Sequence, residues 1–391
     1  MRFGLNLAPH HRVFAAFAAY AFTMGNVFPR LPDIQHAMGV AEGALGLGLI
    51  GTPVGTLISL TFAAPLLERI GFRRALLSLI PLLAILYAIA MLAPSPLVFF
   101  FLLIPVGLAI GCIEMIVNLE ADRTEHAVGF RIMNRAHAFW SIGFFGAGLF
   151  GAWVAQLGLS PLLHLGIVIP LSMLATIVFL GGYKPSPHRS GGSTDAAPKF
   201  AAPTGAIGIL VVVTLSAMIM EGASMDWSAI YMRNVFESGP FLAGLAVATF
   251  AFSQAATRFF ADSFVEAHSP SAVARVLLAL LFVSCLVIFF SPWPILSLLG
   301  FAMAGAGTSA IFPLAMSAAA QRTDRPAAIN VAALAQTSFV VFLLAPPLLG
   351  TVAEHFGIRW SFGIGLPFVI LSFLMAGALG SKPVRTEVPA E

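Results

Sequence analysis

Long apolar segments alternate with short polar or Pro/Gly-rich breaks along the whole chain of 391 residues. A helix of about 20 apolar residues spans the roughly 30 Å hydrocarbon core of a bilayer, and a window of that length finds twelve such segments. They cover residues 12–31, 43–67, 74–93, 97–119, 133–156, 161–183, 204–225, 241–262, 272–290, 294–318, 329–352 and 361–380. The pattern predicts an all-α integral membrane protein with twelve transmembrane helices.

The longest polar segment between these helices, residues 184–203, divides them into six and six. It is rich in Pro, Gly, Ser and Ala and has no periodic apolar face, as is typical of a flexible linker. The two halves also share a local pattern, because residues 151–158 align with residues 350–357 at an offset of 199. Two related six-helix halves follow from this repeat. We predict an N-terminal six-helix bundle at residues 1–183, a cytoplasmic linker at 184–203 and a second, pseudo-symmetric bundle at 204–391.

The positive charges indicate how the helices are oriented. Seventeen of the 20 Lys and Arg residues fall in the termini or in loops on the same side, and only Arg30, Arg233 and Arg359 fall on the other. Since cytoplasmic loops hold most of the Lys and Arg, we predict that both termini are cytoplasmic. The formal charge of +3 is spread over these loops without a basic domain, so no nucleic-acid partner is expected. The N-terminus resembles a signal peptide, but its removal would leave an odd number of spans, and we interpret it as an uncleaved helix.

The composition and the motifs of the chain argue against an enzyme. The chain is 59% hydrophobic and only 9% charged. Its two cysteines, Cys112 and Cys285, lie inside apolar runs, which favours buried thiols over a disulfide or a metal site. The sequence contains no Gly-rich Lys-Ser/Thr loop, catalytic triad, metal-ligand pair or dinucleotide fingerprint. We therefore expect neither an enzyme nor an ATP-driven pump, and no metal or cofactor.

The fourth apolar segment contains a single charged residue, Glu114. A carboxylate that faced lipid there would cost several kcal/mol, so it should face the protein interior or a water-filled cavity. A buried carboxyl group that takes up a proton at physiological pH can carry it together with a substrate. Asn118 lies four residues on, on the same helical face, and could hydrogen-bond the acid or a substrate. Alternatively, Glu114 is locked to a basic partner, of which Arg30 and Arg258 are the candidates, and only holds the bundle together.

Other polar residues within the apolar segments are candidates for a substrate cavity. The fifth segment has a polar stripe of Asn134, His137 and Ser141, with Trp140 beside it. His137 could contact a proton or the substrate, although a membrane histidine can also be purely structural. Polar side chains on the first, seventh, tenth and eleventh helices could contact a substrate or bond neighbouring helices. They are Tyr20, Thr23, Asn26, Glu221, Thr308, Ser309 and Gln336.

Charged residues also lie at the predicted outer helix ends. Arg30 lies at the end of the first predicted helix, and Asp226 follows the seventh. We expect Glu221 or Asp226 to form an outer gate with Arg30 or Arg233; the alternative is simple solvation at the membrane interface.

The loop between the second and third helices has the sequence Ala64-Pro-Leu-Leu-Glu68-Arg69-Ile-Gly71-Phe-Arg73-Arg74. Gly71 permits a tight turn, and an acid paired with such cations can latch two helices in one conformation and release them in another. The alternative is a topology signal that merely keeps the loop inside. Arg258 and Asp262 preserve part of the pattern in the second half.

This loop resembles the Gly-x-x-x-Asp-Arg-x-Gly-x-Arg-Arg signature of the major facilitator superfamily, with Ala64 and Glu68 in place of Gly and Asp. Glu114 with Asn118, residues 221–231 and residues 346–350 look similar to the fucose permease-like bacterial branch. The resemblance implies a central cavity lined by helices one, four, seven and ten, and alternating access driven by the proton gradient.

Three functions follow as hypotheses. The leading one is a monomeric, proton-coupled uptake carrier for a small polar, sugar-like metabolite in the bacterial inner membrane. The second is a drug or metabolite exporter that works as an antiporter. Antiporters of the superfamily usually show a Gly-Pro-x-x-Gly phrase in helix five, and residues 147–151 lack the proline. The third is a transport-dead receptor or scaffold, against which Glu68, Arg69 and Glu114 argue.

Overall fold

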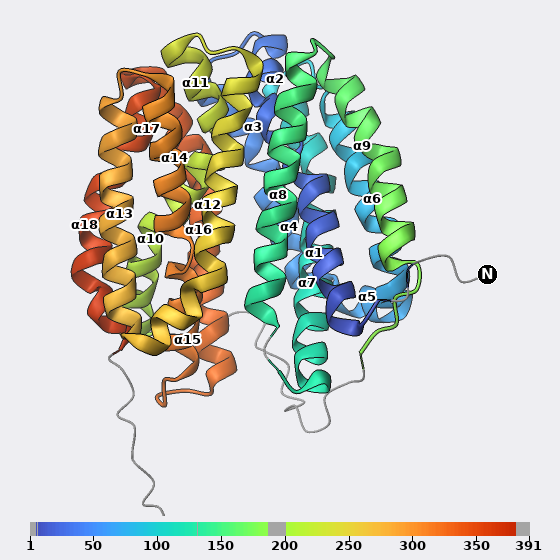
Figure 1. The fold of residues 1–391 in the computed structure, drawn as a ribbon, viewed down its shortest axis with the longest axis vertical. Coiled ribbons are helices and arrows are strands. Elements are labelled where there is room, and N and C mark those ends of the chain that lie inside the picture. Colours follow the sequence, from blue (N-terminus) through green and yellow to red (C-terminus); the bar gives the residue numbers. More distant parts are fainter. Residues whose placement is uncertain (1–4, 6, 131, 187–200, 381–391) are drawn as a thin grey trace, which may run out of the picture.

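The computed structural model describes residues 5, 7–130, 132–186 and 201–380, and its helices stand side by side in two groups (Figure 1). The N-terminal half contains α1 (Pro9–Gly25), η1 (Phe28–Arg30), α2 (Leu31–Met38), α3 (Glu42–Leu49), α4 (Gly51–Phe62), α5 (Ala64–Ile70), α6 (Phe72–Ala90), α7 (Pro96–Val128), α8 (Met133–Gln156), α9 (Pro161–Ala175) and η2 (Thr176–Leu180). The C-terminal half contains α10 (Gly205–Asp226), α11 (Ser228–Phe236), α12 (Pro240–Ala267), α13 (Pro270–Phe290), α14 (Pro294–Thr308), α15 (Ile311–Ala320), α16 (Ala327–Phe356), α17 (Ile358–Gly363), α18 (Gly365–Met375) and η3 (Ala376–Leu379).

The predicted all-α membrane fold is confirmed. In the part of the chain that the structure describes, 11 helices are long and apolar enough to cross a membrane, and they correspond to the second through twelfth predicted segments. The first segment forms α1, which has 17 residues and packs in the N-terminal half before the chain continues into η1 and α2. Some helices extend beyond their apolar segments: α7 ends at Val128 and α12 at Ala267. Hydropathy marks only the part that lies in lipid, whereas a helix can continue into water.

The two halves pack along α8 and α12 and meet again across α3 and α16 at one end of the molecule. We call the end where η2 finishes and α10 begins the linker end, which is the lower end in Figure 1, and the opposite one the distal end. Near the distal end α8 packs against α12 through small residues, and a Cβ atom added to Gly244 would lie 2.6 Å from the Cβ of Ala152. There α3 also packs against α16, where the main-chain N–H of Gly43 donates a 3.1 Å hydrogen bond to Oε2 of Glu354. The distal end is therefore closed.

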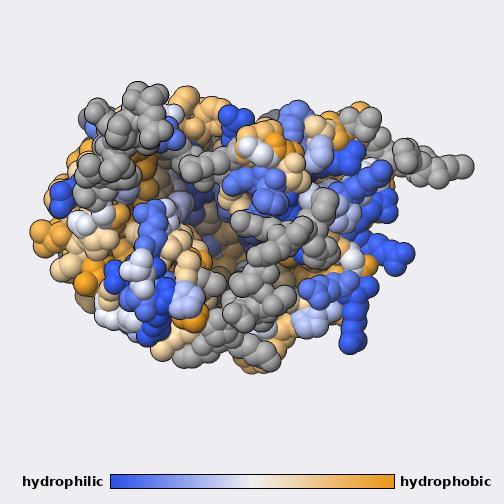
Figure 2. Space-filling model, turned by 90° about the horizontal axis from the view of Figure 1, so that it is seen from below, coloured by the Kyte–Doolittle hydropathy of each residue, from blue (hydrophilic) through white to orange (hydrophobic). Residues whose placement is uncertain are grey.

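Toward the linker end the halves separate. Leu60 of α4 and Ala335 of α16 both line a cavity that lies between them. Instead of contacting α16 closely, α4 packs on α7, where a Cβ atom on Gly107 would clash with the main chain at Thr52 and Thr56. Seen from below, the molecule is hollowed between its two halves (Figure 2). This conformation is closed at the distal end and open toward the linker end.

Candidate functional site

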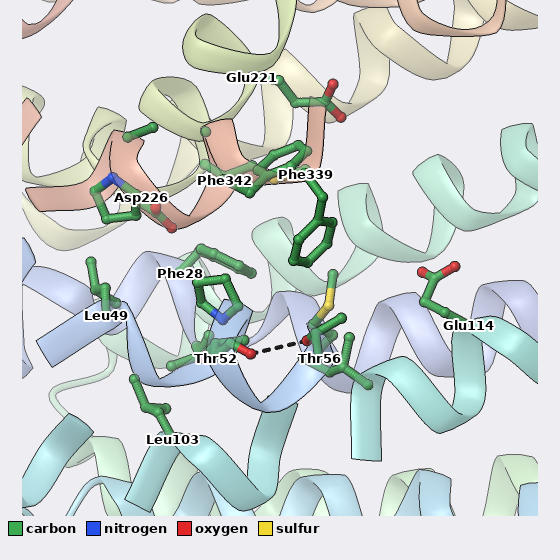
Figure 3. A pocket seen from close by; sticks show the side chains of 18 of the residues that line it. Phe28, Leu49, Thr52, Thr56, Leu103, Glu114, Glu221, Asp226, Phe339 and Phe342 are labelled. Carbon is green, nitrogen blue, oxygen red and sulfur yellow. Dashed lines mark hydrogen bonds between the residues drawn. The ribbon is translucent and has the colours of Figure 1, made fainter. Parts of the chain in front are cut away.

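The hollow continues into a cavity of about 620 Å³. Residues of α1, α4, α6 and α7 line it from one half, and residues of α10, α15 and α16 line it from the other (Figure 3). Most of the wall is apolar, and aromatic rings such as Phe28, Phe339 and Phe342 project into it. The polar side chains in the wall are Tyr20, Thr52, Thr56, Tyr87, Glu114, Asn118, Trp140, Glu221 and Asp226. Helices two, three, five and eleven therefore contribute to the cavity besides those that the family resemblance implied.

Three side chains of the N-terminal half form a continuous hydrogen-bonded chain. Nδ2 of Asn118 donates to Oε2 of Glu114 over 3.0 Å, and Oδ1 of Asn118 lies 3.1 Å from Nε2 of His137. The amide oxygen of Asn118 can only accept a hydrogen bond. The hydrogen between the two atoms therefore belongs to Nε2 of His137 in the neutral ring. Tyr20 of α1 contacts Glu114 as well. Within the described residues Glu114 makes no ion pair, since Arg30 and Arg258 pair with other acids.

In the C-terminal half, Arg258 is the residue that connects a second group of polar side chains. Its Nη2 atom lies 3.6 Å from Oε1 of Glu221, which also accepts a 2.9 Å hydrogen bond from Nε2 of Gln254. Nη1 of Arg258 donates to Oγ of Ser141 on α8 over 3.2 Å, so the guanidinium also ties the two halves together. The sequence predicts Arg258 in a loop latch at the linker end. The structure instead places it nine residues before the end of α12, within the membrane-spanning part.

A break in the tenth transmembrane helix supplies the remaining acceptor for Arg258. α14 ends at Thr308 and α15 begins at Ile311, so the main-chain carbonyl of Ser309 is free to accept a 2.9 Å hydrogen bond from Nε of Arg258. The side chains of Thr308 and Ser309 bond the carbonyls of Gly305 and Ala306 and do not line the cavity. The sequence predicts hydroxyl contacts at this position, whereas the structure uses the backbone.

Several other predicted cavity residues lie elsewhere. Thr23 donates to the carbonyl of Ala19. Oδ1 of Asn26 lies 2.9 Å from Nε2 of His164, inside the N-terminal half. Oε1 of Gln336 accepts from the main-chain N–H of Ala201 near the linker end. The side chains of Asn134 and Asp262 lie outside the described residues.

The distal end carries a charged contact between the halves. Oδ2 of Asp33 lies 2.9 Å from Nε of Arg30, and its Oδ1 lies 2.9 Å from Nη2 of Arg233. Asp33 therefore occupies the position that the sequence suggests for Asp226, which lines the cavity instead. Sequence reasoning missed Asp33 because its partner Arg233 is 200 residues away, although the spacing of three residues from Arg30 was a signal.

Replacing Asp33 by Asn should loosen the distal closure. The two ion pairs are partly exposed and contribute about 1 kcal/mol in total, which corresponds to about a fivefold change in a conformational equilibrium. We expect an Asp33→Asn chain carrying Leu49→Cys to react about five times faster with an impermeant thiol reagent added at the distal side. Glu237→Gln, which changes an exposed acid at the same end, is the matched control. Equal labelling rates in the two variants would remove Asp33 from the gate.

The predicted pairing of Glu68 with the cations of the loop between α5 and α6 does not occur among the described residues in this conformation. Gly71 adopts a φ of +85°, as the predicted tight turn requires. Nη2 of Arg73 donates to the carbonyl of Gly181, whereas Glu68 is exposed and makes no ion pair among the described residues. Arg69 and Arg74 are exposed too. The buried acid at this end is Glu120, which accepts hydrogen bonds from Tyr183, Ser186 and Arg123.

Known proteins resemble this chain along most of its length. Residues 209–390 match the Major Facilitator Superfamily. An uncharacterised transporter, y4wD of Sinorhizobium fredii, is 27% identical over 386 residues, which is 95% of this chain and 98% of that protein. The solved structure of a D-xylose-proton symporter covers 94% of this chain and 96% of its own with a TM-score of 0.71 at 13% identity. A solved structure of the E. coli fucose:proton symporter FucP covers 96% and 99% with a TM-score of 0.60 at 15% identity.

The last two comparisons concern the fold, because their identities are low. Together with the family match and the loop signature at residues 64–74, they agree with the two helical halves and the cavity between them. The chain is a multi-pass membrane transporter whose residues 209–390 match the Major Facilitator Superfamily.

Proposed function

We propose that this transporter is a proton-coupled carrier that takes up a small polar metabolite by alternating access. The observation that supports the proposal best is the chain from Glu114 through Asn118 to His137 at the wall of a cavity that is closed at one end. Glu114 has a hydrogen-bond donor beside it but no cation among the described residues. No ion pair therefore holds it in the charged form, and it is free to take up and release a proton. An acid of this kind is suited to couple proton movement to conformational change.

Each residue has a distinct role in this mechanism. Glu114 binds the proton, and the amide of Asn118 orients its carboxylate. His137 holds the Asn118 side chain in one orientation and provides a second nitrogen that could exchange the proton. With Glu114 neutral, less charge must be moved through the low-dielectric contact between the halves, so the cavity can reopen on the other side.

The direction and the class of substrate follow from the surroundings. If both termini are cytoplasmic, as the distribution of Lys and Arg predicts, the open cavity faces the cytoplasm of the bacterial inner membrane. The two solved symporters of similar fold are named for D-xylose and fucose, which supports a polar, sugar-like substrate. One chain contains the whole cavity, so we propose that a monomer is sufficient.

The proposal is tested with the purified protein in vesicles that enclose a pH-sensitive dye. A panel of sugars, polyols, nucleosides and amines is added outside without an imposed gradient. For right-side-out protein, a substrate that acidifies the interior establishes proton symport, and one that makes it alkaline establishes the antiport that an exporter would use. Transport of a radiolabelled panel member without any change of pH would contradict proton coupling.

Removing the loop cations should slow the transport cycle more than it weakens binding. Arg73 and Arg74 are exposed and do not line the cavity, and we propose that they pair with Glu68 in the opposite conformation. We expect Arg73→Ala with Arg74→Ala to reduce net transport about tenfold while the dissociation constant changes less than about twofold. Arg322→Ala, at an exposed loop in the other half, is the control. An equal loss of binding and transport would point away from a latch.

A further inference from the structure

We propose that the transported substrate carries a cationic amine, and that Asp226 is the carboxylate that receives it. The inference rests on the proposed function only in taking the central cavity as the transport site. It follows from the charges in the cavity wall, from the surroundings of Asp226 and from the aromatic rings beside it.

The cavity is acidic. Its lining contains three carboxylates, Glu114, Glu221 and Asp226, and no Lys, Arg or His among the described residues. Glu221 already has a cationic partner, because Arg258 lies 3.6 Å from it, and Gln254 donates a hydrogen bond to it. Glu114 accepts a hydrogen bond from Asn118 and has its role in proton binding. Among the described residues, Asp226 differs from both in having neither a cation nor a hydrogen-bond donor beside its carboxylate.

Asp226 makes no hydrogen bond and no ion pair in the part of the chain that the structure describes. It is the last residue of α10, near the closed distal end, and Tyr87 of the other half is its polar neighbour. A carboxylate withdrawn from water without a partner is costly, and an opposite charge offsets that cost. An ammonium group on the substrate would supply this charge, whereas a neutral sugar would not.

Aromatic rings line the same cavity as Asp226. In Figure 3, Phe339 and Phe342 lie between Asp226, on the C-terminal half, and Glu114, on the N-terminal half, and Phe28 lies below them. The faces of aromatic rings attract cations, so the same wall that suits an apolar ring also tolerates an ammonium group. A volume of about 620 Å³ admits a small amine with a ring or a polyol body.

The test measures binding to purified full-length protein by titration calorimetry at neutral pH, with probes that differ only in the charged group. The pairs are benzylamine with benzyl alcohol and cyclohexylamine with cyclohexanol. We expect each amine to bind at least about tenfold more tightly than its alcohol, because a desolvated charge pair is formed. Asp226→Asn should abolish this preference, Asp226→Glu should retain it, and Glu237→Gln should leave it unchanged.

The proposal is overturned if the amine and the alcohol bind equally, if neither binds, or if the preference persists in Asp226→Asn. A preference that is lost in Glu114→Gln but not in Asp226→Asn would assign the cation to the other wall and equally overturn it. The measurement needs no vesicle and no gradient, so its failure leaves proton coupling intact. Conversely, an amine preference without substrate-driven proton movement would reject proton coupling and keep the amine site.

Discussion

Glu114→Gln is expected to abolish proton-driven accumulation while leaving substrate exchange active. Glutamine has nearly the same shape as a protonated glutamic acid and can still accept the hydrogen bond from Asn118, so the cavity wall should remain intact. It cannot bind or release a proton, and the variant should therefore behave as if Glu114 were permanently protonated. We expect a loss of accumulation of about 100-fold or more, because neither Glu221 nor Asp226, the other carboxylates of the cavity wall, is hydrogen-bonded to Asn118 in the described residues.

Two radiotracer measurements separate these effects. Accumulation is measured against an imposed proton gradient, and exchange is measured between equal substrate concentrations on both sides of the vesicle membrane. Glu266→Gln, which changes an exposed acid at the linker end, should match the unmodified chain in both. If Glu114→Gln accumulates substrate normally, the acid is structural. If it loses exchange as well, the carboxylate either binds the substrate or stabilises the fold.

Arg258→Leu should have the largest effect on stability. The substitution leaves Glu221 without its cation and removes the donors to Ser309 and Ser141. Both charged side chains are only 16% exposed, and removal of one member of a buried pair costs about 3–5 kcal/mol. We expect a lower melting temperature and almost complete loss of transport.

A second substitution distinguishes the effect of the charge pairing from the effect of side-chain size. Arg258→Leu combined with Glu221→Leu removes both charges and should recover much of the stability but not the transport, because a pair replaced by apolar residues is often tolerated. Arg258→Lys keeps the charge but loses the three-way geometry of the guanidinium, and should fall between the two. A double variant no more stable than the single one would mean that Arg258 acts through Ser309 and Ser141 alone.

The fold and part of the site could be predicted because lipid imposes a simple rule on the sequence. A polar side chain at membrane depth must face protein or a cavity, and this rule identified Tyr20, Glu114, Asn118 and Trp140, which all line the cavity. It does not say which interior surface a residue faces. Helical geometry gives part of that answer, since about 3.6 residues per turn put Asn26 about 120° around the helix from Tyr20. Asn26 accordingly contacts His164 instead of the cavity.

The contacts between the halves could not be predicted from single segments. Arg258 lies near the end of its predicted apolar segment, but α12 continues to Ala267 and places the guanidinium beside Glu221. The pairing of Asp33 with Arg233 depends on how the two bundles meet at the distal end. Tyr87 and Gln254 lie within apolar segments, and their partners become apparent only in three dimensions.

The most direct test of proton coupling measures how the two ends of the molecule respond to a proton on Glu114. Spin labels are placed across the distal end at residues 36 and 237, and across the linker end at residues 127 and 321, in a chain with Cys112 and Cys285 replaced by Ala. We predict that lowering the pH changes the two distances in opposite senses, and that Glu114→Gln makes both independent of pH. Distances that do not respond in the unmodified chain, or that respond equally in Glu114→Gln, would contradict this mechanism.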